Sequence, residues 1–283
     1  MKKIEQIIAE ELNIKVQQVE NTIKLIDEGN TIPFIARYRK EVTGGLSDEV
    51  LRTFGERLNY LRNLEKRKEE VTNSIEEQGK LTEEIVKDLE NAITLAEVED
   101  IYRPYKQKKK TRATVAKAKG LEPLAEIILA QEETKNIQEI AAEYISEEKE
   151  VKTVEEAIQG ALDIIAEMIS DNPEYRKLIK QIVYSKGIIK TTATKPEEKS
   201  AYEMYYDYSE NVNKIPSHRI LAINRGEKEE FLKVKIEKEE DKILEKIEKD
   251  IIKGENQFTQ YLKDTIQDSF KRLIEPSIDR ELR

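Results

Sequence analysis

Apolar residues recur three and four positions apart along most of this chain. Near the start, Ile4, Ile8 and Leu12 share one stripe, and a longer stripe runs from Val50 to Ile75. This spacing indicates amphipathic helices, because residues three and four apart lie on one helical face. The longer stripe predicts a helix of about 30 residues, or about 45 Å.

Residues that favour the beginning or the end of a helix lie between these stripes. Side chains suited to cap a helix N-terminus stand at Ser47, Thr82, Thr94, Thr153 and Asn172. Helix ends are predicted at Asn13, Gly29 and Gly79, residues that tolerate the left-handed conformation. We expect a break between helices at Thr31-Ile32-Pro33.

The pattern changes after Gly187. Thr191, Thr192 and Pro196 interrupt the helical spacing, and residues 231–236 alternate apolar and polar positions, which predicts a strand. We therefore expect a helical domain over residues 1–190 and the start of a second region over 191–283.

Composition agrees with a helical protein. Charged residues make up 38% of the 283 positions, and Gly (10) and Pro (7) are sparse. The predicted fold class is mainly α: multi-helical, with helix-turn-helix-like hairpins, long helices and at most a few short strands. Since Cys is absent, disulfides, thiolate zinc sites and a cysteine nucleophile are excluded.

Targeting signals are not apparent in the sequence. No stretch approaches the ~20 apolar residues of a membrane span, and the N-terminal residues lack the apolar core of a signal peptide. We expect a cytoplasmic protein with no membrane partner.

Charge is concentrated in one place. The net charge is −9, yet residues 102–119 carry eight cations and no acid. Tyr102 and Tyr105 are interleaved with them, and aromatic rings beside cations can stack on bases while the cations contact phosphates. The alternative is a loop that pairs with acidic faces of the same chain, such as residues 132–156. The candidate nucleic-acid-binding residues are Arg103, Lys106, Lys108, Lys109, Lys110, Arg112, Lys117 and Lys119.

A second, smaller basic cluster consists of Arg37, Arg39 and Lys40. The planar guanidinium of arginine suits phosphates and carboxylates. For this cluster we favour a structural role, in ion pairs that fix one helix against another.

Two stretches have the spacing of a helix-turn-helix: Ala9 to Asn13, followed by a helix from Val16, and Ala116 to Gly120, followed by a helix from Pro123. Each second helix is poor in cations, which argues against base readout in a major groove. Helical scaffolding is the favoured use.

Residues for catalysis are few. His218 is the only histidine, and no phosphate-binding glycine loop or dinucleotide fingerprint is present. Carboxylates are too numerous to single out a pair. We expect no catalytic residues, no metal site and no cofactor. Tyr202, Tyr205, Tyr206 and Tyr208 are interpreted as a packing surface.

Three ordered motifs resemble the Tex family. They are TIPFIARYRKEVTGGL at 31–46; IYRPYK at 101–106, with RA at 112–113 and GLEPLA at 120–125; and IPSHR at 215–219, with LA at 221–222 and NRGE at 224–227. Tex proteins are bacterial transcription accessory proteins, RNA-binding relatives of the eukaryotic elongation factor Spt6. The resemblance implies that further domains follow this region: a YqgF-like domain, a helix-hairpin-helix module and an S1 domain, the family's main nucleic-acid binder.

Together these observations predict a non-enzymatic helical scaffold and interaction module of a transcription accessory protein, with weak, sequence-independent binding of RNA or DNA. Other expected partners are the transcription machinery and the remaining domains of the longer protein. The alternatives are a helix-turn-helix DNA-binding regulator and a metal-dependent hydrolase fragment.

Overall fold

The computed structural model describes residues 3–107, 110–132 and 135–283. The chain divides into two compact units, residues 1–102 and 103–283. Over the described residues the structure is 66% helical, which confirms the predicted mainly α class. No helix in this part of the chain is long and apolar enough to cross a membrane.

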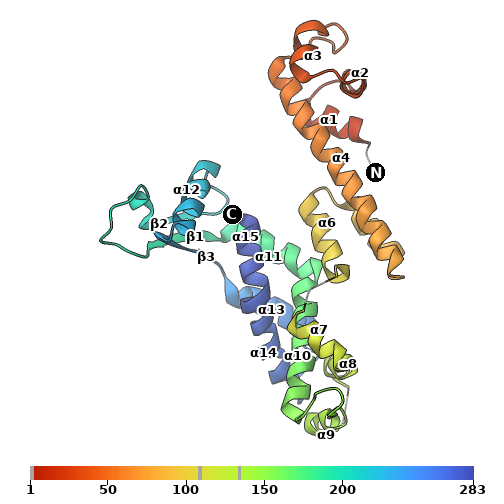
Figure 1. Cartoon of the computed structure of the whole chain (residues 1–283), viewed down its shortest axis with the longest axis vertical. Coiled ribbons are helices and arrows are strands. Elements are labelled where there is room, and N and C mark those ends of the chain that lie inside the picture. Colours follow the sequence, from red (N-terminus) through yellow and green to blue (C-terminus); the bar gives the residue numbers. More distant parts are fainter. Residues whose placement is uncertain (1–2, 108–109, 133–134) are drawn as a thin grey trace. The chain divides into compact units, whose positions relative to one another are not determined.

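The first unit is entirely helical in its described part and is organised around one long helix (Figure 1). Helices α1, α3, α5 and α6 all contact α4. Its helices are α1 (Ile4–Leu12), α2 (Val16–Asp27), α3 (Ile32–Tyr38), α4 (Asp48–Glu77), α5 (Glu83–Asn91) and α6 (Leu95–Tyr102).

The capping residues predicted for this unit are confirmed. Ser47 Oγ accepts a hydrogen bond from the Val50 N–H at 3.2 Å, and the 30-residue α4 begins there. Thr94 and Glu97 form the reciprocal capping box, with both hydrogen bonds at 3.2 Å. Such caps satisfy N–H groups that the first turn of a helix leaves unpaired.

One expectation here needs correction. A break does separate two helices near Thr31-Ile32-Pro33, but it covers residues 28–31, because α2 ends at Asp27 and Ile32 already opens α3. Proline is compatible with the first turn of a helix, where its missing N–H has no partner to lose.

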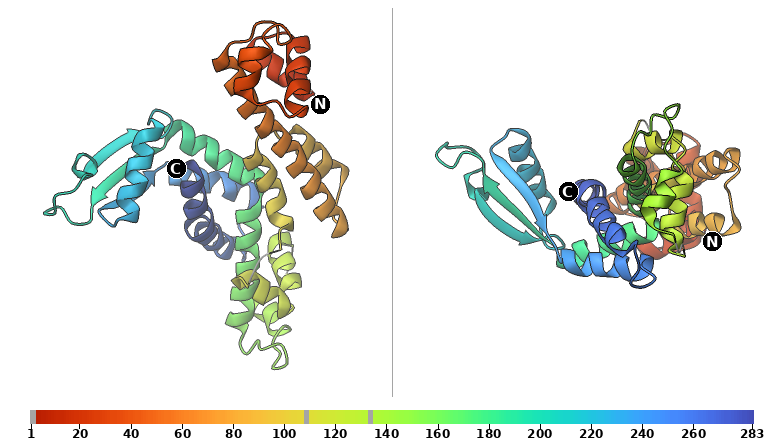
Figure 2. Two further views of the ribbon diagram at one scale, coloured as in Figure 1. Left: turned by 45° about the horizontal axis from the view of Figure 1, so that its top comes forward. Right: turned by 90° about the horizontal axis from the view of Figure 1, so that it is seen from below.

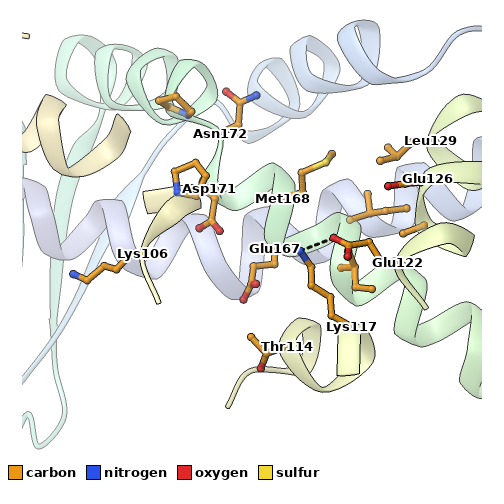
Figure 3. Close-up of a pocket in the computed structure, with 15 residues that line it drawn as sticks. Lys106, Thr114, Lys117, Glu122, Glu126, Leu129, Glu167, Met168, Asp171 and Asn172 are labelled. Atoms are coloured by element: carbon orange, nitrogen blue, oxygen red, sulfur yellow. Dashed lines mark ion pairs between the residues drawn. The ribbon is translucent and has the colours of Figure 1, made fainter. Parts of the chain in front are cut away.

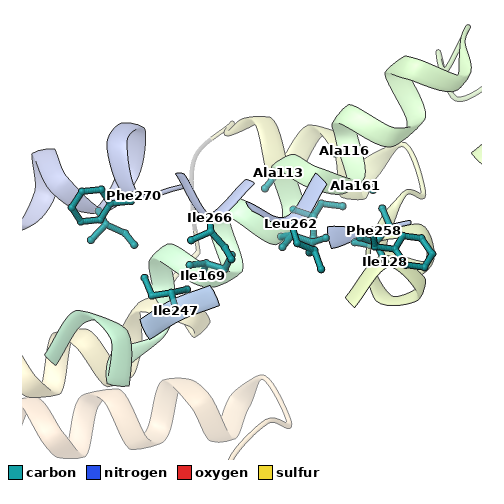
Figure 4. Packing of buried hydrophobic residues seen from close by; sticks show 14 of the residues in the cluster. Ala113, Ala116, Ile128, Ala161, Ile169, Ile247, Phe258, Leu262, Ile266 and Phe270 are labelled. Carbon is teal, nitrogen blue, oxygen red and sulfur yellow. The ribbon is translucent and has the colours of Figure 1, made fainter. Parts of the chain in front are cut away.

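The second unit is built around α10 (Val154–Asp171), which contacts α7, α8, α9, α11 and α14. Figure 4 shows side chains from these helices, among them Ala161, Leu262 and Ile266, packed into one apolar core. The helices of this unit also include α7 (Arg112–Ala118), α8 (Glu122–Ala130), α9 (Ile137–Ala142), α11 (Pro173–Lys186), α12 (Ser217–Lys228), α13 (Glu240–Ile251), α14 (Thr259–Asp268) and α15 (Glu275–Leu282), with short 3₁₀ turns at Arg103–Tyr105 and Glu203–Tyr205.

A π-helical turn, Ser269–Ile274, lies between α14 and α15. Pro276 cannot donate a backbone hydrogen bond to the carbonyl of Arg272, four residues earlier, and a wider turn accommodates that loss. Ser269 Oγ meanwhile donates to the Ala166 carbonyl at 2.6 Å, which fixes the turn against α10.

A small antiparallel sheet lies between α11 and α13 in the chain, with α12 packed on it (Figure 2). Its order is β2 (Asp207–Asn211), β1 (Ile188–Ala193), β3 (Leu232–Glu237). Lys190 on the central strand pairs with Ser209 on one side and Lys235 on the other. The strand predicted at 231–236 is confirmed as β3.

The threonine-rich segment, taken as a pattern break, forms the central strand β1. Only Ile189 and Thr191 are buried on it, so its apolar signal is short. The predicted packing role of the tyrosines is confirmed, since Tyr202 and Tyr205 are buried beside Ile223 of α12. The boundary predicted between residues 190 and 191 lies inside the second unit, where the chain enters the sheet, and stays a prediction.

Candidate nucleic-acid interface

The basic segment, residues 103–119, combines a connection with a short helix. Thr111 Oγ1 accepts a hydrogen bond from the Thr114 N–H at 3.0 Å and so caps α7. Because of this cap, Arg112 is the first residue of α7 and not part of the connection before it. Lys106 and Lys110 do lie on the connection, and both are exposed. Lys108 and Lys109 fall outside the described residues.

Helix α7 is held closely against α10. Ala113 and Ala116 are buried on the face toward α10, which leaves Arg112 and Lys117 exposed to solvent. Gly160 makes the approach possible, since a Cβ there would lie 2.4 Å from Leu121 Cδ1 and 3.3 Å from Ala116 Cβ. The fold thus presents part of the basic segment on a rigid helix.

Arg103, Lys117 and Lys119 have partners inside the second unit. Arg103 Nη2 lies 3.2 Å from Ser277 Oγ and 3.3 Å from Glu281 Oε1. Lys117 pairs with Glu122 at 2.9 Å, and Lys119 Nζ donates to the Glu150 carbonyl at 2.8 Å. The predicted pairing within the chain therefore applies at least to these residues. Lys106, Lys110 and Arg112 stay candidates for an external ligand because their side chains are exposed.

The interleaved tyrosines are engaged as well. Tyr102 belongs to the first unit, where its hydroxyl lies 3.0 Å from Ser74 Oγ and the Arg67 guanidinium lies 5.4 Å from its ring centroid. Tyr105 is half-buried. A stacking platform beside the basic segment therefore has little exposed aromatic surface to use.

Two hollows flank α7. The first, about 510 Å³, is shown in Figure 3, with Lys117 drawn in its ion pair to Glu122. Its lining includes four carboxylates, from Glu122, Glu126, Glu167 and Asp171, against two lysines. This excess of negative charge makes the first hollow unsuitable for a phosphate.

The second hollow, about 590 Å³, has the opposite balance. Lys110, Arg112 and Lys119 line it, together with Glu156 and Asp163. Burial raises the pKa of Asp163, although the charges of Arg272 and Arg112 oppose this shift. Cations therefore outnumber acids here, and this side of α7 is the better place for a phosphate group.

The smaller basic cluster lies at the end of α3 and just beyond it. Arg37, Arg39 and Lys40 are exposed, and the structure shows no ion pair for them among the residues it describes. The predicted role as ion pairs between helices is therefore not what the structure shows. Phe34 and Tyr38, which the sequence reasoning missed as exposed aromatic residues, lie on the same helix. The sequence does contain a sign of this exposure. Ile32, Ile35 and Ala36 recur at helical spacing and pack inward, which leaves Phe34 and Tyr38 on the outward side of the helix.

Both helix-turn-helix-like stretches contain a tight turn between helices, with left-handed residues at Asn13 (φ 52°) and Gly120 (φ 76°). Helices α1 and α2 contact each other. Nothing in this geometry tests DNA binding, which stays a prediction. His218 is exposed near the start of α12. Within residues 3–107, 110–132 and 135–283, no group of three His, Asp or Glu side chains is arranged to hold a metal ion.

Two family models match the chain. The Tex-like protein N-terminal domain matches residues 2–76, and the Tex central region-like model matches residues 132–283.

Relatives align along most of the sequence. YdcI of Bacillus subtilis is 52% identical over 284 residues, which cover 99% of this chain and 40% of that protein. Transcriptional accessory protein Tex of Neisseria gonorrhoeae is 39% identical over 84% of this chain and 31% of its own length. S1 RNA-binding domain-containing protein 1 of Homo sapiens is 30% identical over 98% of this chain and 29% of its own length.

The chain thus spans 29–40% of the length of these relatives. The central-region model alone covers more than half of the chain, and it follows the N-terminal model in the same order as the resembling motifs. The chain belongs to the Tex family.

Proposed function

We propose that this chain is a non-enzymatic helical scaffold and interaction module of a transcription accessory protein, and that it binds RNA or DNA weakly and without sequence preference. Membership of the Tex family supports the first part, since a relative is named as a transcriptional accessory protein. Interaction with the remaining domains of a longer protein and with the transcription machinery belongs to the same proposal, as does a cytoplasmic location.

One observation carries the nucleic-acid part. Lys106, Lys110 and Arg112 are exposed within a stretch of eight cations that contains no acid. Lysine and arginine at phosphates release counterions, and this gives affinity without reading the bases. The net charge of −9 opposes a polyanion at long range, so the binding is expected to be weak.

Fluorescence anisotropy with labelled RNA and DNA strands tests the proposal. If about four cations reach phosphates, log affinity for single strands falls with log salt at a slope near −3, and the Kd lies at ~10⁻⁴ to 10⁻⁶ M. Replacing Lys108, Lys109, Lys110 and Arg112 by Ala removes most of that slope.

A matched control separates local contact from overall charge. Replacing the exposed Lys24, Lys66, Lys80 and Lys87 by Ala removes the same number of charges elsewhere, and we expect a smaller change in the salt slope. Equal effects of the two quadruple variants contradict a local interface. Nanomolar, sequence-selective binding contradicts the scaffold and favours the helix-turn-helix regulator.

A further inference from the structure

The outer face of α3 carries aromatic residues where a surface helix usually carries charges. Ile35 has no exposed surface and packs with Leu25 and Leu51 in the core of the first unit. Phe34 and Tyr38, four residues apart, lie together on the outward side of α3 and expose 37% and 59% of their surfaces. Single exposed apolar residues are common on proteins, but here two rings stand together.

The two rings form a contiguous surface with a guanidinium beside it. The ring centroids of Phe34 and Tyr38 lie 5.2 Å apart at an interplanar angle of 48°. The Arg39 guanidinium carbon lies 5.2 Å from the Phe34 centroid. Arg39 thus contacts the Phe34 ring and belongs to the same surface as the two aromatic side chains.

Positive charge dominates this surface. Arg37, Arg39 and Lys40 are exposed, and the described residues contain no ion pair for any of them. Glu41 is the one acid between Thr31 and Ser47. An electropositive patch persists here in a chain whose net charge is negative.

The turn after α3 is fixed by hydrogen bonds. The Gly45 N–H donates to the Lys40 carbonyl at 2.8 Å. From α2, Gln18 Nε2 donates to the Thr43 and Gly44 carbonyls at 3.1 and 3.2 Å, and Asn21 Nδ2 donates to the Val42 carbonyl at 3.0 Å. Ordering this backbone in advance reduces the entropy lost when a ligand binds.

Rings, cations and a rigid support are the combination that binds single-stranded nucleic acid. Bases stack on aromatic side chains, worth about 1–3 kcal/mol per base, while cations follow the phosphates. A duplex hides the faces of its bases, and the Asp and Glu side chains of an acidic protein segment have no aromatic ring to stack on Phe34 and Tyr38. Charge and shape together therefore favour a single strand.

We propose that the α3 surface, defined as Phe34, Arg37, Tyr38, Arg39 and Lys40, is a stacking site for the bases of single-stranded nucleic acid. This inference rests on the proposed function, since it names a second contact surface for the same ligand. It adds a mode of recognition, base stacking, that the basic segment does not offer.

Tryptophan fluorescence can report binding at the α3 surface alone. Because the sequence contains no Trp, Tyr38→Trp in the full chain introduces a single indole at the α3 surface. Titration with a ten-nucleotide RNA is expected to quench its fluorescence in parallel with the anisotropy of a labelled strand. Tyr184→Trp is the matched control, because Tyr184 is 57% exposed on α11, and its fluorescence is expected to stay unchanged.

Affinity gives a second measurement. The double change Phe34→Ala and Tyr38→Ala is expected to weaken binding about tenfold, whereas Tyr184→Ala leaves it unchanged. Circular dichroism checks that the double variant keeps its helices. An abasic strand of the same length is expected to bind the parent chain about as weakly as the intact strand binds the double variant.

The outcomes distinguish this inference from the proposed function. If the parent binds RNA but Tyr38→Trp is not quenched, or an abasic strand quenches it equally, stacking at α3 is wrong and the proposed function stands. A surface for a protein partner would give this unquenched result. If quenching occurs while the quadruple variant of the basic segment keeps the parental salt slope, the α3 site stands and the basic segment is wrong. If the parent binds no nucleic acid, both are wrong.

Discussion

Arg176 of α11 has no exposed surface, and its Nη2 donates a hydrogen bond to Oε1 of Glu281 in α15. Lys180 Nζ lies 2.6 Å from Oε2 of the same carboxylate. Arg103, the first cation of the basic segment, reaches Oε1 at 3.3 Å. Glu281 thus joins three cations, and through Arg103 it anchors the start of the segment proposed to contact phosphates.

We expect Glu281→Gln to destabilise the second unit by about 1–3 kcal/mol, because it removes the negative charge that faces a buried guanidinium. Urea unfolding followed by circular dichroism measures the change. Glu255→Gln, at an exposed position in the same unit, is the control and is expected to have little effect. Equal stabilities of the two variants would contradict the anchoring role.

We expect the stabilising effect of the Glu281 carboxylate to depend on pH. Burial alone would raise the pKa of Glu281, but the hydrogen bond from Lys180 and the charges of Arg176 and Lys180 outweigh it, so the pKa lies below its usual value. A lowered pKa in the folded state stabilises the fold above the unfolded pKa of about 4.3, and this contribution is lost as the pH falls through the folded value. The stability difference between the parent and Glu281→Gln should therefore be full at pH 7 and shrink below about pH 4. If the stability difference between the two proteins instead grows on acidification, the pKa of Glu281 is not lowered in the folded state and this prediction is wrong.

Local signals in the sequence predicted much of the helical framework. Ser47 and Thr94 cap helices in the structure as their positions suggested, and Asn13 ends α1 in the left-handed conformation. These features depend on neighbours within four residues, so a sequence contains them directly.

Features that depend on distant residues were not predictable in this way. Strand β1 becomes a strand because β2 and β3 pair with both its edges. The exposure of Tyr38 follows from which face of α3 packs on Leu25 and Leu51. The basic segment was recognised from its charge, but its division between a connection and α7 depends on the cap at Thr111 and on Gly160, 40 or more residues later in the chain.

Gly160 should be hard to replace. Gly160→Val places a branched side chain where even a Cβ meets Leu121, which is itself only 1% exposed and cannot move aside into solvent. We expect a loss of about 1–3 kcal/mol from overpacking, measured by urea unfolding.

A matched substitution isolates the packing effect. Gln159→Val introduces the same β-branched residue one position earlier, at an exposed site on α10. Valine is a poorer helix former than glutamine but a better one than glycine, so helix propensity alone predicts the larger loss at position 159. A larger loss at position 160 therefore reports the contact with Leu121. If the two valine variants lose equal free energy of unfolding, Gly160 is not required for the close approach of α7 to α10.

The last prediction concerns the accessibility of the basic segment. Trypsin should cut first between Lys106 and Arg112, because Lys106 and Lys110 are exposed on a connection, whereas most other exposed cations, such as Lys66 in α4, lie in helices whose backbone hydrogen bonds resist local opening. Mass spectrometry of an early time point identifies the site. Changing all five cations from Lys106 to Arg112 to Gln should abolish the early cut, whereas Lys66→Gln should not delay it. A saturating single-stranded oligonucleotide should slow cleavage of the parent, because bound phosphates cover the same side chains. If the segment resists trypsin while other sites are cut, its cations are occupied within the chain, and the contact surface for nucleic acid has to be sought at α3 alone.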